Sequence, residues 1–237
     1  MNKKMLKAAL AGLMLSVSSI ASAGLIYSSS QIGSDFRDIS GSGTQFSLSD
    51  DDLTGDIAFG FNFNFYDIVH DSARISSNGF IDFGPDYDEG CCTGGTIAPT
   101  GPNGIFAGLW EDLDSNNDTT GNMFYQTIGS AGSREFIVGF YDIAHYPTGN
   151  LVNFEMIIHE GSNNLEIQFG SLANEDVHTI GIENYDGTSG EQFYRGTNIS
   201  QFSNTGVLFQ ATVPEPSTLA IFALGVMGLA SRRFKKQ

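Results

Sequence analysis

Apolar residues alternate with small or polar ones along much of the chain between residues 24 and 212. The clearest stretch is 57–65, where an apolar side chain occupies every second position and phenylalanine fills four of them. A period of two predicts a strand with one buried face and one face toward solvent. The same alternation recurs in further segments, at 136–140, 152–158, 165–169 and 180–182.

Shorter strands and the turns between them are also visible in the pattern. Apolar runs predict strands at 73–75, 79–83, 105–110, 122–128 and 207–210. Turn residues separate the runs, at Ser77-Asn78-Gly79, at 160–164 and at Tyr185-Asp186-Gly187. No stretch of 24–212 has the period of an amphipathic helix, and no repeat of fixed length is present. About ten or more short strands, each with one apolar face, predict an all-β fold, an antiparallel β-sandwich over 24–212.

The first 23 residues have the pattern of a secretory signal peptide. Three lysines precede an apolar run at 8–20, and Ala21-Ser22-Ala23 is a small-residue cleavage pattern. We therefore expect a signal helix over 1–23 and cleavage between Ala23 and Gly24. The alternative is an uncleaved membrane anchor, which fits less well because the apolar run is short.

The last residues of the chain, 213–237, have three parts in a fixed order. A Pro-Glu-Pro triplet comes first, formed by Pro214, Glu215 and Pro216. An apolar stretch within 217–231 follows, and the chain closes with a basic cluster made of Arg232, Arg233, Lys235 and Lys236. The basic cluster is expected to stay on the cytoplasmic side of the membrane. As a helix, 217–231 would be about 22 Å long against a hydrocarbon core of about 30 Å, so this short transmembrane helix suits temporary retention better than permanent anchoring.

These three parts together resemble the PEP-CTERM sorting signal, which an exosortase recognises and processes near the triplet. The resemblance implies that an exosortase is a partner and that Pro214, Glu215 and Pro216 are its recognition residues. It also implies a Gram-negative bacterium that makes extracellular polysaccharide. The protein would be held briefly in the membrane by its tail and would then reach the cell surface or the exterior. An ordinary tail anchor is the alternative.

The region between the two ends is strongly acidic. It has four arginines, no lysine and 26 acidic residues, a formal net charge of −22. Such a surface repels phosphate backbones and anionic lipid headgroups, which argues against nucleic acid as a partner. It suits divalent cations, although an acidic surface that only keeps an exported protein soluble is the plainer explanation.

Several short motifs follow one another within 55–195. They are SSNGFIDFG at 76–84, LWEDLD at 109–114, FYQ at 124–126, FEMII at 154–158 and IEN at 182–184. In this order they resemble a nidogen-like (NIDO-type) extracellular β domain. The resemblance implies adhesion or contact with matrix components. The segment 85–101, which holds the cysteines, is expected to be a local insertion.

One acidic loop has the spacing of calcium ligands. Side-chain oxygens fall at alternate positions, on Asp112, Asp114, Asn116 and Asp118, and this spacing lets one loop wrap several hard oxygens around Ca²⁺. The loop is not an EF-hand, because it lacks the central glycine and the final glutamate. A solvated acidic turn is the alternative. Two further acidic stretches, 50–52 and 186–188, are weaker candidates. No cofactor is required by the sequence, and calcium is the one it suggests.

Cys91 and Cys92 are adjacent and are the only cysteines of the chain. Outside the cytoplasm they are expected to be oxidised. Either a disulfide between these two neighbours or pairing with another chain would satisfy them.

The sequence contains no motif typical of catalysis. The histidines are scattered, with no metalloprotease helix motif and no nucleophile elbow. We therefore expect a non-enzymatic surface or matrix protein, with a role in adhesion or in extracellular-polysaccharide and biofilm association. One alternative is a carbohydrate-binding module, in which Trp110 and the phenylalanines form a stacking face. A less favoured alternative is an extracellular hydrolase whose catalytic triad is assembled in space.

Overall fold

The structure, a computed structural model of the 237-residue chain, describes residues 24–84, 92, 94–97, 103–114 and 122–214. The signal peptide predicted at 1–23 and the transmembrane stretch predicted at 217–231 lie outside these residues. Within the described ranges, no helix has both the length and the hydropathy needed to cross a membrane.

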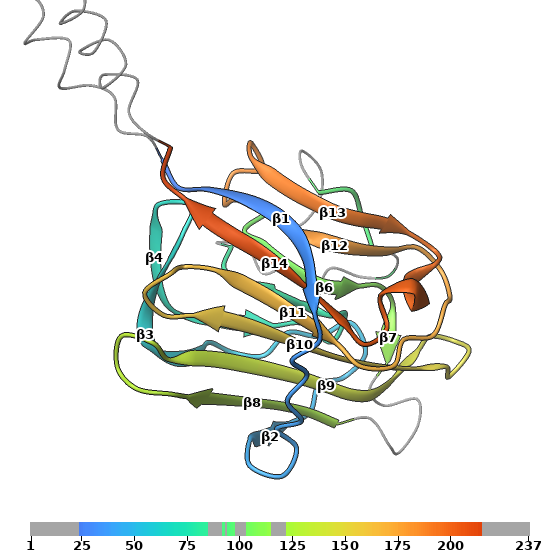
Figure 1. Ribbon diagram of the computed structural model, residues 1–237. Helices are drawn as coiled ribbons and strands as arrows, with labels where there is room; N and C mark the ends of the chain where they lie inside the picture. Colours follow the sequence, from blue (N-terminus) through green and yellow to red (C-terminus); the bar gives the residue numbers. More distant parts are fainter. Residues whose placement is uncertain (1–23, 85–91, 93, 98–102, 115–121, 215–237) are drawn as a thin grey trace, which may run out of the picture. The chain divides into compact units, whose positions relative to one another are not determined.

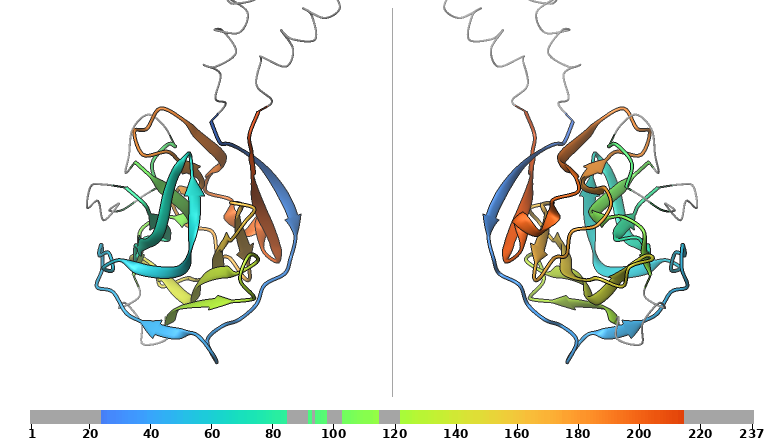
Figure 2. Two further views of the ribbon diagram at one scale, coloured as in Figure 1. Left: turned by 90° about the vertical axis from the view of Figure 1, so that its left-hand side faces the viewer. Right: turned by 90° about the vertical axis from the view of Figure 1, so that its right-hand side faces the viewer.

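The described strands form two sheets that pack face to face (Figures 1 and 2). The larger sheet has eight strands, in the order β1 (Ile26–Gly33), β14 (Thr205–Thr212), β11 (Leu165–Phe169), β10 (Leu151–His159), β9 (Glu135–His145), β8 (Asn122–Ile128) and β2 (Thr44–Phe46), with β7 (Leu113–Asp114) pairing with β9. The smaller sheet has six, in the order β13 (Gly190–Gly196), β12 (His178–Glu183), β6 (Ile105–Trp110), β5 (Phe80–Asp82), β4 (Ile68–Ile75) and β3 (Ile57–Phe65). The predicted all-β antiparallel sandwich is therefore confirmed.

Strand β3 shows how the alternating pattern becomes a buried face. Phe59 and Phe63 are fully buried, while Ala58 and Asn62 between and beside them are exposed. The register with β4 shifts between Ala58 and Phe63, and Gly60, in the shifted part, has a φ of +82° that favours glycine. The phenylalanines of β3 stay buried on both sides of this irregularity.

Phenylalanine side chains from both sheets meet in the interior. Phe59 of β3 lies 5.0 Å from Phe136 of β9, measured between ring centroids, and Phe106 of β6 lies 6.1 Å from Phe209 of β14. Each pair joins one sheet to the other. Burying an aromatic or aliphatic side chain of this size contributes about 1.5–3 kcal/mol, so the aromatic interior is the main force that holds the two layers together.

Trp110 belongs to the core and not to a binding surface. It is 4 % exposed and packs in a cluster with Leu53, Phe80 and Ile97. The segment 94–97 covers it closely, because a Cβ atom added at Gly95 would lie 2.8 Å from the indole ring. The proposed sugar-stacking face at Trp110 is therefore wrong, and the alternating phenylalanines that would extend it are interior as well.

The turn between β4 and β5 fixes the backbone that leads to the acidic segment 111–114. Gly79 in this turn has a φ of +77°, and a Cβ atom there would lie 2.3 Å from the carbonyl oxygen of Leu109. Any other residue would therefore force the β6 backbone to move. The amides of Gly108 and Leu109 both donate hydrogen bonds to the Gly79 carbonyl oxygen, at 3.1 and 3.0 Å.

The chain enters and leaves the sandwich on neighbouring strands. β1 and β14 lie side by side in the larger sheet (Figure 1). β14 is the last strand and ends at Thr212.

Candidate functional site

Two acidic loops that are far apart in the sequence meet in the fold. Carboxylate oxygens of Asp50, Asp51 and Asp112 lie within 4.8 Å of one another, and we call these three residues the carboxylate cluster. Asp114, on β7, adds a further negative charge near Asp50 and Asp112. The sequence analysis treated 50–52 and the loop at Asp112 as separate candidates, and the structure brings them together. Asn116 and Asp118 lie outside the described residues.

Asn78 holds the two acidic loops in place. Its side-chain amide donates a 2.7 Å hydrogen bond to Asp51, and its side-chain oxygen accepts a 3.0 Å bond from the Leu113 amide. Its neighbour Ser77 exchanges two bonds with Asp52, one from backbone to backbone and one from the Asp52 amide to the Ser77 hydroxyl. Asn78 is fully buried, and its side chain bonds to both loops. In the sequence, Asn78 is visible as a turn residue and as part of the SSNGFIDFG motif, but not as a link between two acidic loops.

The electrostatics of the carboxylate cluster favour a bound cation. Burial raises the pKa of Asp112 to about 6, and the negative charges of Asp51, Asp50, Glu111 and Asp114 add to this effect. Burial and the charges of Asp51 and Asp114 raise the pKa of Asp50 as well. Crowded carboxylates repel one another, and a divalent cation with oxygen ligands relieves that repulsion.

The third acidic stretch, 186–188, has a different role. Asp186 accepts hydrogen bonds from the amide and the hydroxyl of Thr188, at 3.2 and 2.6 Å. These bonds lower the pKa of its carboxyl group. The geometry is that of a side-chain-stabilised turn between β12 and β13.

A second polar assembly lies on the outer face of the larger sheet. The segment 34–43 crosses this face between β1 and β2 (Figures 1 and 2), and we call it the strap. Three alternate amides of the strap donate hydrogen bonds to side chains of three successive strands of the sheet. The pairs are Asp35 with Gln168 of β11 at 2.7 Å, Arg37 with Glu155 of β10 at 2.8 Å, and Ile39 with Tyr141 of β9 at 2.9 Å.

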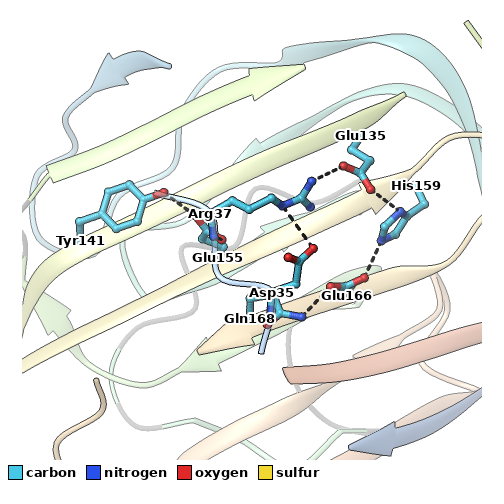
Figure 3. Close-up of polar contacts among 8 residues, drawn as sticks. All are labelled: Asp35, Arg37, Glu135, Tyr141, Glu155, His159, Glu166 and Gln168. Carbon is cyan, nitrogen blue, oxygen red and sulfur yellow. Dashed lines mark hydrogen bonds and ion pairs between the residues drawn. The ribbon is translucent and has the colours of Figure 1, made fainter. Parts of the chain in front are cut away.

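Charged side chains extend the strap contacts into a network (Figure 3). Arg37 pairs with Glu135 at 2.6 Å, and Glu135 lies 3.3 Å from one ring nitrogen of His159. The other ring nitrogen of His159 lies 3.0 Å from Glu166, to which Gln168 donates a 2.7 Å hydrogen bond. Burial alone would raise the pKa of Glu166, but the hydrogen bonds with His159 and Gln168 have the larger combined effect and lower it.

The strap also covers apolar side chains on the outer face. Phe36 and Ile39 pack against a cluster made of Phe124, Ile137, Tyr141 and Ile157. The outer face of the larger sheet is thus a small second core. This explains why Glu155, which points into it beneath the strap, is fully buried.

Glu155 is the most strongly perturbed group of this assembly. Burial raises its pKa to about 7, although it accepts bonds from the Arg37 amide and the Tyr141 hydroxyl and lies near the Arg37 charge. The strap is therefore attached to a carboxyl group that changes its charge near neutral pH.

The remaining predicted site residues lie at the margins of the described ranges. Cys92 is disulfide-bonded, and Cys91, its predicted partner, lies outside the described residues. Ala23, Glu215, Pro216 and the basic cluster lie outside them too. Gly24 and Pro214 are the described residues next to the two predicted processing points.

Two family profiles match the chain. One, described as NIDO related, matches residues 26–223, and the other, described as the PEP-CTERM protein-sorting motif, matches residues 212–236. Both resemblances drawn from the sequence motifs are therefore confirmed. The first match spans every strand from β1 to β14, and the second begins at the last residue of β14. No curated protein and no solved structure matches the chain.

Calcium binding at the carboxylate cluster stays a prediction with a direct test. In a chelator, Asp112→Asn should leave the melting temperature unchanged or raise it, because it removes like-charge repulsion. In Ca²⁺ at ten times its Kd, the unaltered chain should gain about 3–5 °C while Asp112→Asn gains little. Asp56→Asn, which removes an exposed acid elsewhere, is the control and should gain as much as the unaltered chain. An equal gain in Asp112→Asn, or none in the unaltered chain, would contradict calcium at this cluster.

The buried Glu155 predicts that stability falls as the pH rises. The native state keeps the proton up to about pH 7, while the unfolded chain releases it near pH 4.3. Between these values the native state binds more protons, so the free energy of unfolding decreases with increasing pH. Glu155→Gln should remove this pH dependence. The stability of the variant relative to the unaltered chain should therefore increase with pH, by up to about 1.4 kcal/mol per pH unit.

Denaturant unfolding at pH 5, 6, 7 and 8 measures this effect. Glu160→Gln is the matched control, since its bonds to Arg134 lower the pKa of Glu160 to about 2. Its charge is constant over this range, so its effect on stability should be the same at each pH. A Glu155→Gln difference that does not change with pH would show that Glu155 does not titrate in the window.

Proposed function

Because the chain belongs to the NIDO-related family and ends in a PEP-CTERM protein-sorting motif, we propose that its sandwich is a non-enzymatic module that contacts extracellular polysaccharide or another matrix component. The motif marks an exported protein that an exosortase sorts to the cell surface. After sorting, the domain would act in adhesion or in association with a biofilm matrix.

The position of the motif is the observation that carries the proposal. The last strand, β14, ends at Thr212, where the motif begins. Val213 is 63 % exposed, and the Pro-Glu-Pro triplet follows at once. Processing near the triplet would therefore release the tail without cutting into a strand. This arrangement suits a folded domain whose C-terminal sorting motif is removed after export.

The acidic surface supports contact through divalent cations. Residues 24–212 have a formal net charge of −22, so the sandwich repels acidic polysaccharides unless cations bridge the two. The carboxylate cluster offers hard oxygen ligands for Ca²⁺. A matrix contact of this kind would depend on calcium and weaken at high salt.

Structural roles for the histidines favour a binding module over an enzyme. His145 and His178 are fully buried, and His159 belongs to the network beneath the strap. His70 is held half-buried against Phe83, with ring centroids 5.1 Å apart. Two of the four rings are closed off from solvent and the other two are only partly exposed, so none lies open to a substrate.

The tail also defines a proposed route to the surface. We place 217–231 temporarily in the inner membrane of a Gram-negative bacterium. The basic cluster would remain in the cytoplasm and the sandwich would face the periplasm. Recognition of Pro214, Glu215 and Pro216 by the exosortase would end this stage.

Intact mass and cell fractionation of the native protein test the sorting step. In a host with an exosortase, the chain should end near the triplet and be found outside the membrane. In the same host without the enzyme, or after Glu215→Ala with Pro214→Ala and Pro216→Ala, it should keep its tail and stay in the membrane fraction. Replacing Gln237 by Ala, beyond the basic cluster, is the control and should not alter processing. A tail retained in both hosts would contradict the proposed sorting step.

A further inference from the structure

Three ionisable side chains that the proposed function does not use meet where the two sheets join. Glu111 follows β6, His178 begins β12, and His145 ends β9; we call them the seam cluster. One carboxylate oxygen and one nitrogen from each ring lie within 4.8 Å of one another. Nδ1 of His145 lies 2.6 Å from Oε2 of Glu111. The two histidine rings meet edge to face, with centroids 5.0 Å apart.

The strand register brings these residues together from both sheets. Thr179 of β12 pairs with Trp110 of β6, so His178 and Glu111 are the next residues along these antiparallel strands. Leu113, two positions after Glu111, pairs with His145 of β9. The seam cluster therefore links β6 and β12 of the smaller sheet to β9 of the larger one.

The seam cluster is buried and its hydrogen bonding is incomplete. His145 and His178 are fully buried, and Glu111 is 1 % exposed. Nε2 of His145 and both ring nitrogens of His178 have no hydrogen-bond partner among the described residues. Backbone carbonyls of Asp176 and Gly196 favour a charge on the His178 ring, but no bond of normal geometry forms to either. Buried polar atoms without partners are costly and call for a bound ion or water.

The local charge favours a cation over a water molecule. Glu111 brings its carboxyl group into a buried site, where it is 1 % exposed, and the negative charges of Asp176 and Glu175 act on the same group. A positive ion would offset this concentration of acidic groups.

Two imidazoles and one carboxylate are a ligand set of zinc. Ca²⁺ and Mg²⁺ prefer oxygen ligands alone, so the two ring nitrogens select against them. Zinc bonds of about 2.0–2.1 Å in a tetrahedron separate the ligand atoms by about 3.3 Å, which small side-chain shifts can reach from the present spacing. We propose that Glu111, His145 and His178 bind one Zn²⁺, with water as the fourth ligand, and that this ion links the two sheets.

The burial of the ligands makes the proposed zinc structural and not catalytic. A catalytic zinc keeps a position open to substrate, whereas each of these three ligands is at most 1 % exposed. The chain has another reason to use a metal link. Its only cysteines are adjacent, so no disulfide within the chain can join distant segments. Metals and disulfides serve the same purpose in exported domains.

Metal analysis of the full chain, exported by its producing cell and purified without chelators, is the first test. Plasma mass spectrometry should find about one zinc per chain. His178→Gln should reduce the zinc content at least tenfold, while His70→Gln, which alters a histidine outside the seam cluster, should retain it. Asp112→Asn should also retain it, because the carboxylate cluster is a separate site.

A second measurement does not depend on whether the variants fold. The unaltered chain, stripped by a chelator, should lose melting temperature and regain it with Zn²⁺ alone. The gain should be about 5–10 °C at a hundredfold excess of free zinc over Kd, and Ca²⁺ should not replace it. Co²⁺ should give the visible absorption bands of a tetrahedral site. A chain that contains no zinc as purified, and that takes up none after chelation while folded, would overturn the proposal. So would zinc binding that is undiminished in His178→Gln and His145→Gln.

Discussion

The packing of two phenylalanine-rich sheet faces against each other is the constraint on which the rest of the structure depends. The contacts of Phe59 with Phe136 and of Phe106 with Phe209 join the layers directly. Once the layers are in place, the loops at their margins have fixed positions. The seam cluster is one consequence, since it collects residues from strands of both sheets.

Buried polar groups then decide how the surface segments attach. Asn78 ties two acidic loops together, and Glu155, Gln168 and Tyr141 receive the amides of the strap. Each such group would be costly if left unpaired, so each specifies one arrangement of its segment. The same reasoning distinguishes the seam cluster, because there Nε2 of His145 and both ring nitrogens of His178 lack hydrogen-bond partners among the described residues.

Sequence patterns predicted most of the strands with buried apolar residues and missed three edge strands that are mostly exposed or half-buried. The alternation over 57–65 became β3, and the runs at 105–110 and 122–128 became β6 and β8 with the same bounds. β1, β2 and β13 lie at sheet edges with mostly exposed or half-buried residues, so no period of two marks them. The strap had a faint signal, since Ile157 and Ile158 are consecutive and buried, which requires cover on both faces. No sequence pattern marks the proximity of Asp50 and Asp112, because it arises from tertiary contacts alone.

The folded domain, from β1 to β14, is separate from the sorting motif, which begins where β14 ends. Transfer of residues 213–237 to another protein tests this separation most directly. Residues 213–237 would be fused to an unrelated exported reporter in a host with an exosortase, and the intact mass and location of the reporter measured. The account predicts a reporter truncated near the Pro-Glu-Pro triplet and found outside the membrane. A reporter that keeps the whole tail in the membrane, in a host that processes the native chain, would show that the sandwich itself takes part in sorting and would contradict the account.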